Sequence, residues 1–349
     1  MSFSDKLVRI ARQMAKEAYL GILFLTGLLW WARSRAAKLG VVVITLHRIL
    51  PDQQYDSAQP QPGMAVRAST FERFLEYASR YCECVLAADS APDPAKTPRP
   101  RVALTFDDGW KDNFDTALPI SRRHGIQFTV FICPKMMTSR ESFWTSRAEE
   151  LWATAQQAGK TDVINSQCGV EAGRSANLLI ESLKHANAND RDTLLGRLQA
   201  ALQPYAQEAK NEASEQMLTW SEVQEMSASG IAFGSHTNTH VILPDIPDSD
   251  ALQELTESKR AIEAALVACP LFAYPNGDWS PHVRDLVAQA GYRAAFINSP
   301  GIWQKQTHRL SIPRVNVWEG SLTGPGGRFS RLALEYAIFW KAYRAGRNS

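Results

Sequence analysis

Short apolar runs alternate with longer amphipathic stretches along most of this 349-residue chain. Apolar runs that are bounded by polar or turn-forming residues are typical of strands buried on both faces. Such runs lie at 41–46, 102–106, 127–132, 231–235, 271–274 and 293–297. Between them, apolar residues recur with helical spacing at 70–80, 113–124, 249–268 and 280–290. Strands that alternate with helices predict a parallel α/β architecture.

The stretch 139–217 interrupts this alternation. It has no strand-like run, and segments such as 148–152 and 194–198 have the spacing of helices. We expect a helical insertion, which is either a lid over the substrate or a group of helices packed on the core fold. Neither end carries a linker rich in Pro, Gly and Ser, so we place the insertion within one catalytic domain that spans 41–320.

Two short motifs carry the candidate chemistry. Asp107 and Asp108 follow one apolar run, and His236 and His240 follow another. Singly, each motif is ambiguous, because Asp-Asp-Gly is typical of a solvated turn and two histidines can be surface residues. Together, one carboxylate and two imidazoles form a three-ligand set for a hydrolytic zinc ion, and the second carboxylate is free to accept a proton. The sequence therefore predicts a metal-dependent hydrolase.

Three motifs point to a known family. They are TFDDG at 105–109, HTNTH at 236–240 and FAYPNG at 272–277. With them, the stretch 41–317 resembles polysaccharide deacetylases of the NodB-homology class, carbohydrate esterase family 4. The resemblance implies a distorted, partly open (β/α) barrel of about seven strands, with its site at the C-terminal ends of the strands.

The resemblance also implies roles for individual residues. Asp108, His236 and His240 would bind the metal, which we expect to be Zn²⁺, although the ligand set also accepts Co²⁺ or Ni²⁺. Asp107 would be the general base, and a backbone N–H within 274–276 would stabilise the oxyanion. The predicted substrate-binding residues are Trp110, Tyr274, Pro275, Asn276 and Arg314.

The chain departs from the family pattern at two positions. The family's general acid is a histidine near the end of the domain, but His308 lacks the usual Leu-x-His context. His47, directly after the first apolar run, resembles the acid histidine of circularly permuted exopolysaccharide deacetylases. We therefore assign the acid to His47, with strand capping as the alternative. Ala273 stands where many members have an arginine that orients the base; Arg314 is a candidate replacement, and a structural role for it stays open.

The two ends of the chain are basic and apolar. Residues 1–40 carry a net charge of +5 and residues 321–349 a net charge of +4, whereas the whole chain carries +2. The uncharged run 18–32 would form a helix about 22 Å long, short of the ~30 Å hydrocarbon core of a bilayer. We predict that 1–40 associates with a membrane surface and that 321–349 is a basic amphipathic helix. Packing of these helices on the barrel is the alternative.

The sequence also bears on location and partners. No Ala-x-Ala cleavage site precedes the first strand, and Lys and Arg flank the apolar run on both sides, which disfavours a cleaved signal peptide. The five cysteines form no disulfide framework, which favours a reducing compartment. We expect a peripheral or monotopic protein of a bacterial inner membrane, on the cytoplasmic rather than the periplasmic face. Nucleic acid is not an expected partner, because the basic residues lie on apolar helices.

The predicted function is removal of an N-acetyl group from an amino sugar in a bacterial glycan, with a polyprenyl-linked precursor as one form of the substrate. A deformylase or an O-acetyl esterase of the same mechanism stays open, because one methyl group is worth only ~1–3 kcal/mol of discrimination. The alternative outside the enzymes is a catalytically silent, membrane-bound glycan-binding protein. Asp107 argues against it, since a binding site has no need of a base.

Overall fold

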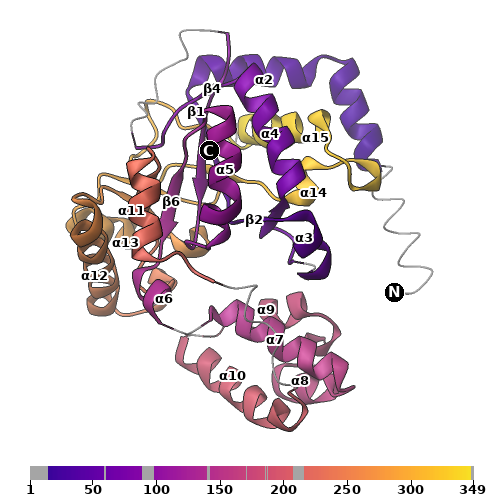
Figure 1. Ribbon diagram of the computed structural model, residues 1–349, viewed down its shortest axis with the longest axis vertical. Helices are drawn as coiled ribbons and strands as arrows, with labels where there is room; N and C mark the ends of the chain where they lie inside the picture. The colour runs from indigo at the N-terminus through magenta and orange to yellow at the C-terminus, as the bar shows by residue number, and fades with distance from the viewer. Residues whose placement is uncertain are drawn as a thin grey trace.

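A nearly closed barrel of parallel strands forms the centre of the protein. The computed structural model describes residues 15–346, except 59, 89–97, 140–141, 170, 185, 187 and 207–215. Seven strands follow one another in the order β10-β1-β5-β6-β7-β8-β9, and a parallel bridge between Phe296 and Ile312 nearly closes the sheet. The predicted (β/α) barrel is confirmed (Figure 1). The strands are β1 (Val41–Leu46), β5 (Arg101–Phe106), β6 (Thr129–Ile132), β7 (Ala232–Ser235), β8 (Leu271–Ala273), β9 (Ala294–Phe296) and β10 (Arg314–Asn316), with the short β4 (Glu83–Cys84) paired to β5.

Alternate strand residues face either the barrel interior or the surrounding helices. Val42 and Ile44 belong to the main hydrophobic cluster, which the outer helices complete, whereas Val41, Val43 and Ala103 belong to a smaller cluster inside the barrel. Both faces are therefore apolar along most strands, which explains the continuous apolar runs in the sequence. The covering helices include α4 (Ala68–Tyr81), η1 (Asn113–Ala117), α5 (Leu118–His124), α11 (Trp220–Ala228), α12 (Asp248–Leu266) and α13 (Pro281–Gln289), and a small unit of β2 (Arg48–Leu50), α3 (Asp52–Ala58) and β3 (Ala65–Arg67) follows β1.

The insertion is a group of helices with a hydrophobic core of its own. After α6 (Pro134–Thr138) it contains α7 (Trp144–Gln157), α8 (Thr161–Cys168), α9 (Ala176–Lys184) and α10 (Ala188–Leu202). Leu179, Leu195 and Leu198 are buried in a cluster that includes no barrel residue. The chain leaves the barrel after β6 and returns before β7, so the insertion stands at the C-terminal ends of the strands, below the barrel in Figure 1. Parts of the predicted insertion, 140–141 and 207–215 among them, lie outside the described residues.

The N-terminal region contains two helices where the apolar run suggested one. Residues 15–25 are helical, the chain turns at Thr26 and Gly27, and α2 (Leu28–Leu39) follows. Gly27 has a φ of +73°, in the left-handed region that favours glycine. Residues 1–14 of the predicted membrane-associating region lie outside the described residues. Across the part of the chain that is described, no helix combines the length and the apolar composition needed to cross a bilayer.

The C-terminal helix contacts the barrel on one side and the N-terminal helices on another. After α14 (Glu319–Leu322) it runs through α15 (Arg331–Glu335), η7 (Tyr336–Trp340) and α16 (Lys341–Ala345). Ile338 and Ala342 join the main hydrophobic cluster with the barrel. The ring of Tyr336 lies edge-on to that of Tyr19, with centroids 5.9 Å apart. The described N-terminal helices, from residue 15 to residue 39, and the C-terminal helix are thus packed together beside the barrel.

Candidate active site

Strand register brings two candidate residues side by side at the mouth of the barrel. β1 and β5 are parallel and in register up to their last residues, Leu46 and Phe106. The backbone N–H of Asp107 donates to the carbonyl oxygen of Leu46 (3.0 Å). Because strand side chains alternate between two faces, His47 and Asp107 continue the rows of residues that face the barrel interior.

Asp108, His236 and His240 converge on one point. The Oδ1 atom of Asp108 lies 3.6 Å from Nε2 of His236 and 3.4 Å from Nε2 of His240. Bonds of about 2.0–2.1 Å to a tetrahedral zinc ion place two ligand atoms about 3.3 Å apart, so these separations fit a bound ion. The buried Oδ1 atom has no hydrogen-bond partner among the described residues, as expected of an atom that binds a metal.

Neighbouring groups fix the orientation of these ligands. Nδ1 of His236 lies 2.7 Å from the carbonyl oxygen of Ala273, so Nδ1 carries the proton and Nε2 presents a lone pair. The indole N–H of Trp110 donates to Oδ2 of Asp108 (2.9 Å), which leaves Oδ1 for an ion. The ligand atoms are therefore held in place by the protein itself.

Burial keeps both histidines in the form that binds metals. It lowers the pKa of His236, although the carboxylates of Asp107 and Asp108 act in the opposite direction. Burial likewise lowers the pKa of His240 to about 4, against the opposing effect of Asp108. Both imidazoles are neutral at physiological pH, and a neutral imidazole is the metal-binding species.

The backbone around the site adopts conformations that L residues seldom use. The φ angle is +75° at Asp108, +62° at Thr237 and His240, and +59° at Asn276. Among the non-glycine residues that the structure describes, only Val267 shares this property. Such angles cost about 1–3 kcal/mol each and persist only where the surrounding structure imposes them. Their concentration here indicates that the fold enforces the geometry of the site.

Glu254 on α12 holds the turn between the two histidines. Its carboxylate accepts hydrogen bonds from the backbone N–H groups of Asn238 (2.8 Å) and Thr239 (2.9 Å) and from the hydroxyl of Thr239 (2.8 Å). This carboxylate thereby replaces the backbone partners that a regular helix or strand would provide.

Arg314 forms a two-pronged ion pair with Asp107. Nη1 donates to Oδ1 and Nη2 donates to Oδ2, both at 2.7 Å, and Arg314 has no exposed surface. Arg314 begins β10 level with Val43, below the mouth of the barrel, so its side chain extends upward through the interior. Burial alone would raise the pKa of Asp107, but Arg314, with smaller effects of His236 and His47, lowers it to about 2. The arginine that is missing at Ala273 thus has a counterpart on another strand.

His47 lies in the same group of ionisable residues. Its charge acts on the pKa values of both Asp107 and His240, so its ring is near both. Its Nδ1 atom is buried without a hydrogen-bond partner in the described part of the chain. A ring nitrogen that the protein leaves unpaired can donate to a bound substrate. His308, by contrast, accepts a hydrogen bond from the backbone N–H of Leu310 (3.1 Å) in the turn before β10.

Comparison with known families identifies this arrangement. The family model of polysaccharide deacetylases matches residues 95–166 and 184–295, more than half of the chain. The chain belongs to this family. Both motifs that supply the candidate metal ligands lie within the matched residues, and the protein is a hydrolase that deacetylates a polysaccharide.

The deacetylase shares its fold with solved structures at low sequence identity. The Streptococcus pyogenes deacetylase PplD in complex with acetate is 16% identical, with a TM-score of 0.54 over 86% of this chain and 99% of that chain. IcaB from Ammonifex degensii is 17% identical, with a TM-score of 0.54 over 87% of this chain and 98% of that chain. No curated protein sequence matches significantly. The family that the motifs predicted, with circularly permuted members among its structural neighbours, is confirmed.

The FAYPNG motif of the deacetylase is less accessible than predicted. Tyr274 is fully buried, and its hydroxyl donates to the carbonyl oxygen of Leu310 (2.9 Å). Its side chain lies in the layer between barrel and helices, so the prediction that it contacts substrate is wrong. Pro275 is also buried, and only Asn276 of the three presents its side chain to solvent. The backbone N–H of Tyr274 donates to the carbonyl oxygen of Phe296, and Pro275 has no backbone N–H. The backbone N–H of Asn276 is therefore the remaining candidate for the oxyanion donor.

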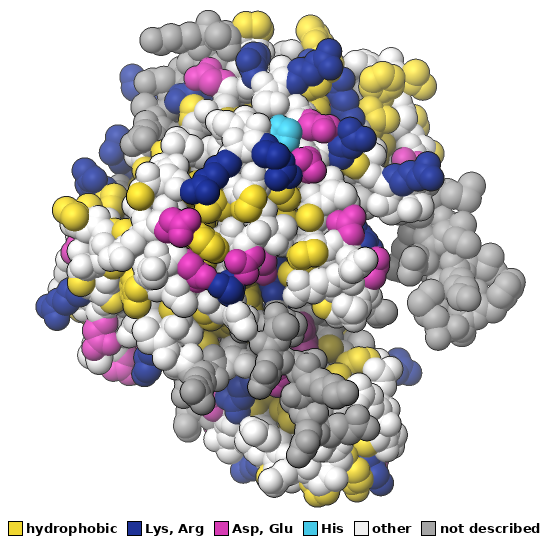
Figure 2. All heavy atoms as spheres, viewed as in Figure 1, with side chains coloured by type: hydrophobic (Ala, Val, Ile, Leu, Met, Phe, Trp, Pro, Cys, Tyr) yellow, Lys and Arg dark blue, Asp and Glu magenta, His cyan; other side chains and the backbone are white. Residues whose placement is uncertain are grey.

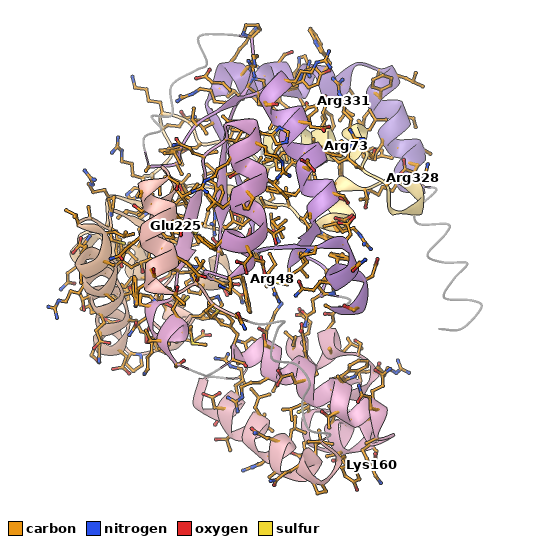
Figure 3. All side chains as sticks on the ribbon, viewed as in Figure 1. Arg48, Arg73, Lys160, Glu225, Arg328 and Arg331 are labelled. Carbon is orange, nitrogen blue, oxygen red and sulfur yellow. The ribbon has the colours of Figure 1, made fainter. Side chains whose placement is uncertain are left out.

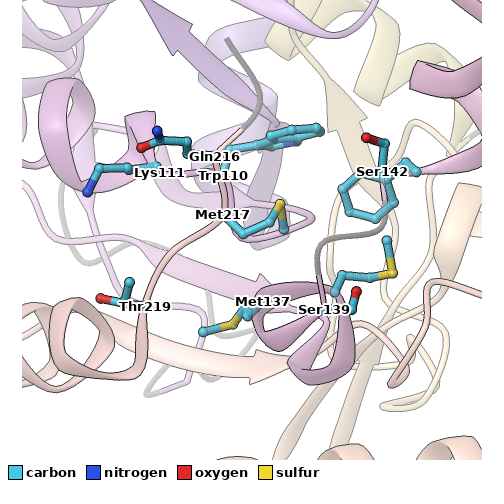
Figure 4. A pocket seen from close by; sticks show the side chains of 10 residues that line it. Trp110, Lys111, Met137, Ser139, Ser142, Gln216, Met217 and Thr219 are labelled. Atoms are coloured by element: carbon cyan, nitrogen blue, oxygen red, sulfur yellow. The ribbon is translucent and has the colours of Figure 1, made fainter. Parts of the chain in front are cut away.

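A pocket of about 330 Å³ opens beside the candidate metal ligands, and Figure 4 shows the side chains that line it. Trp110, Met136, Phe143 and Met217 line it, together with polar residues from both ends of the insertion. The ring of Phe143 lies 5.1 Å from that of His240, so the pocket reaches the metal-binding group. Five of its ten lining residues are apolar and five are polar, so the walls offer both packing surface and several hydrogen-bonding groups to a bound molecule. Trp110 lines this pocket in addition to orienting Asp108, and its contact with substrate stays a prediction.

Several residues of the site were not predicted from the sequence. The guanidinium of Arg48 lies over the Trp110 ring, 4.5 Å from its centroid, and Nε donates to Asp112 (2.8 Å). Figure 3 shows Arg48 between the barrel and the insertion. Arg48 and Asp112 adjoin the predicted motifs and could have been suspected from their position. Phe143 and Glu254 lie far along the chain from the residues they contact, and no local pattern marks them.

Proposed function

We propose that this protein is a metal-dependent N-deacetylase that acts on an amino sugar of a bacterial glycan. The observation that carries the proposal is the set of Asp108, His236 and His240 with Asp107 beside it, held by Arg314. A divalent ion held by those three ligands would supply Lewis-acid polarisation of the substrate carbonyl and lower the pKa of water to about 7. We expect Zn²⁺; oxygen and imidazole ligands are also compatible with Co²⁺ or Ni²⁺.

The chain's own residues supply the proton transfers. Asp107 stays ionised because its pKa is about 2, and it accepts a proton from the attacking water. Arg314 binds both of its oxygens and thereby fixes its orientation. His47 donates a proton to the departing amine, which would otherwise be a very poor leaving group. The backbone N–H of Asn276 stabilises the oxyanion.

The presence of a candidate acid supports an amide substrate over an ester. An alkoxide leaves more readily than an unprotonated amine, so an O-acetyl esterase has less need of a residue in the position of His47. A deformylase would use the same residues and differ only in the space beside the acyl carbon. The ion pair between Asp107 and Arg314 argues against a silent glycan-binding protein, because that pair maintains a base that binding does not require.

We also propose that the protein associates with the cytoplasmic face of a bacterial inner membrane as a peripheral or monotopic protein. An apolar tip supports this: Ile22, Phe24, Leu25 and Trp30 are 57%, 59%, 84% and 63% exposed. Figure 2 shows hydrophobic side chains gathered at the upper right, over the N-terminal helices, with Lys and Arg side chains beside them. Contiguous exposed apolar residues of this kind mark interaction sites. All five cysteines are free, which supports a reducing compartment.

The test is acetate release by the purified full-length protein with Zn²⁺ added. The substrates are soluble N-acetylhexosamine oligomers and a polyprenyl-diphosphate-linked N-acetylhexosamine, with N-formyl and O-acetyl analogues in parallel. Asp107→Asn should abolish release, while Asp285→Asn, at an exposed helix position, should not change it. Release from the lipid-linked sugar alone would identify the precursor as substrate. Absence of release from both N-acetyl substrates, or release that survives Asp107→Asn, would contradict the proposal.

A further inference from the structure

A second pocket, of about 390 Å³, lies between the N-terminal helices and the C-terminal helix, outside the active site. Its walls come from three parts of the chain that meet beside the barrel: residues 16–20, residues 318–321 and the helix that contains Tyr336 and Lys341. Lys16 and Lys341 line it together with the aromatic side chains of Tyr19, Tyr336 and Trp318. None of the residues that line this pocket is acidic.

The two lysines give this pocket a net positive charge, which Glu17 beside it offsets only in part. Lys16 is held in place, because Nζ donates to the carbonyl oxygen of Gly320 (3.0 Å). Burial lowers the pKa of Lys16 and the charge of Lys341 lowers it further, while the adjacent Glu17 acts in the opposite direction. Among the described residues, no carboxylate lies within ion-pair distance of Lys341. Two neighbouring ammonium groups in a concave, aromatic-lined site favour an anionic ligand.

The pocket adjoins the apolar tip along one helix. Tyr19 lines the pocket and Leu25 belongs to the tip, six residues further along, which corresponds to about 9 Å at 1.5 Å per residue. An apolar helix face inserts about 5–10 Å into the boundary between headgroups and acyl chains. With the tip at that depth, the pocket would lie at the level of the lipid phosphates.

We propose that this pocket binds the phosphate of an anionic phospholipid while the apolar tip is inserted in the same leaflet. The inference rests on the membrane association proposed above and adds to it a defined headgroup site. The lysines contact the phosphate, and the aromatic residues pack against the glycerol and the upper acyl chain. The protein would accordingly prefer anionic to neutral membranes by a specific contact rather than by its net charge.

The experiment is co-sedimentation of the full-length protein with vesicles of phosphatidylcholine, with and without phosphatidylglycerol. One variant is Lys16→Gln with Lys341→Gln, and its matched control is Arg35→Gln with Lys38→Gln. The control pair removes the same charge from exposed positions on α2 outside the pocket. It is matched in its distance from the apolar tip, because Lys38 is as many residues from Gly27 along the chain as Lys16 is. Lys160→Gln with Lys184→Gln in the insertion, where Figure 3 shows Lys160 at the opposite end of the molecule, is a distant control.

We expect the pocket variant to bind anionic vesicles about 25-fold more weakly, since each lysine near such a surface contributes roughly a factor of five. The α2 pair should weaken binding by no more than about fivefold, and the insertion pair should leave it unchanged. The side chain of Lys341 makes no hydrogen bond to the described residues, so Lys341→Gln alone should leave the fold intact. It should weaken binding about fivefold, and it tests the proposal even if Lys16→Gln disturbs folding. Equal losses for the pocket and α2 pairs, or no loss for the pocket pair, would overturn the proposal.

Leu25→Asp separates this inference from the proposals on which it rests. It should abolish binding to both kinds of vesicle, and if it does not, the membrane association itself is wrong. Acetate release from soluble oligomers should be unchanged in all these variants, because none of the substituted residues lies at the candidate active site. If Leu25→Asp abolishes binding and the pocket and α2 pairs weaken it equally, the headgroup site is contradicted and the membrane association still stands.

Discussion

In folded proteins, charged side chains are usually exposed and large apolar ones buried. The mouth of the barrel and the apolar tip depart from this distribution in opposite ways. At the mouth, charged groups such as Asp107 and Arg314 are buried, whereas at the tip Leu25 is 84% exposed. A buried charge is tolerated only with a partner, and an exposed apolar group needs no partner for the fold. Oδ1 of Asp108 and Nδ1 of His47, to which we assign chemistry, are among the buried polar atoms that lack a partner in the described part of the chain. At the mouth the fold thus leaves polar atoms available for chemistry, and at the tip it leaves apolar surface available for contact.

Removal of the proposed acid should have a large effect on the rate of N-deacetylation. His47→Ala should lower the rate of N-deacetylation by about 10²–10⁴, the usual contribution of a positioned acid. Hydrolysis of p-nitrophenyl acetate should change little, because its leaving group needs no proton. Parallel kinetics with the two substrates measure the difference. Equal losses on both substrates would show that His47 has another role.

Breaking the buried ion pair should affect the fold itself. Arg314→Met leaves Asp107 buried without its counter-ion, which typically costs about 3–5 kcal/mol. Burial would then dominate, and the pKa of Asp107 would rise. Urea denaturation measures the loss of stability, and the acid limb of the pH–rate profile should move to higher pH. An unchanged acid limb in a folded variant would argue against Asp107 as the base.

In the presence of a chelator that removes any bound metal, the free energy of unfolding should decrease as the pH falls from 6.5 to 4. The folded state holds the pKa of His240 near 4, below the ordinary value of 6.5. The unfolded chain therefore binds a proton in this window that the folded protein does not, which lowers the free energy of unfolding by about 3 kcal/mol at most. Urea midpoints at pH 7 and 4.5, with and without chelator, measure this. His240→Asn should reduce the slope; an unaltered slope would place the linkage elsewhere.

The smallest effect on stability is expected at the apolar tip. Here an exposed apolar residue, Leu25, lies only two positions after a buried one, Leu23. Leu25→Ser should change the free energy of unfolding by less than about 0.5 kcal/mol, since it is a surface substitution. Leu23→Ala, at a position only 3% exposed, should cost about 2–5 kcal/mol. Thermal denaturation of both variants provides the comparison. A large loss of stability in Leu25→Ser would mean that the tip is covered by protein rather than exposed.

Local patterns predicted most of the barrel, because buried parallel strands give continuous apolar runs. β10 was not predicted, since two of its three residues, Arg314 and Asn316, are polar. The ligand set followed from motifs at strand ends. The contact of Arg314 with Asp107 depends on strand register, which no local pattern encodes. Tyr274 was assigned to substrate binding together with the rest of its motif, although side-chain alternation along the strand directs its ring toward the outer helices.

The pairing of Asp107 with Arg314 has a consequence for the order in which the chain folds. These residues are separated by 207 positions, and Arg314 lies on the last strand to be synthesised. A nascent chain that ended before β10 would have to bury a carboxylate without its counter-ion, which disfavours early closure of the barrel. Long-range contacts of this kind also slow folding. The barrel should therefore close only after β10 has been synthesised, and C-terminal truncations that remove β10 should yield an open, protease-sensitive chain instead of a smaller enzyme.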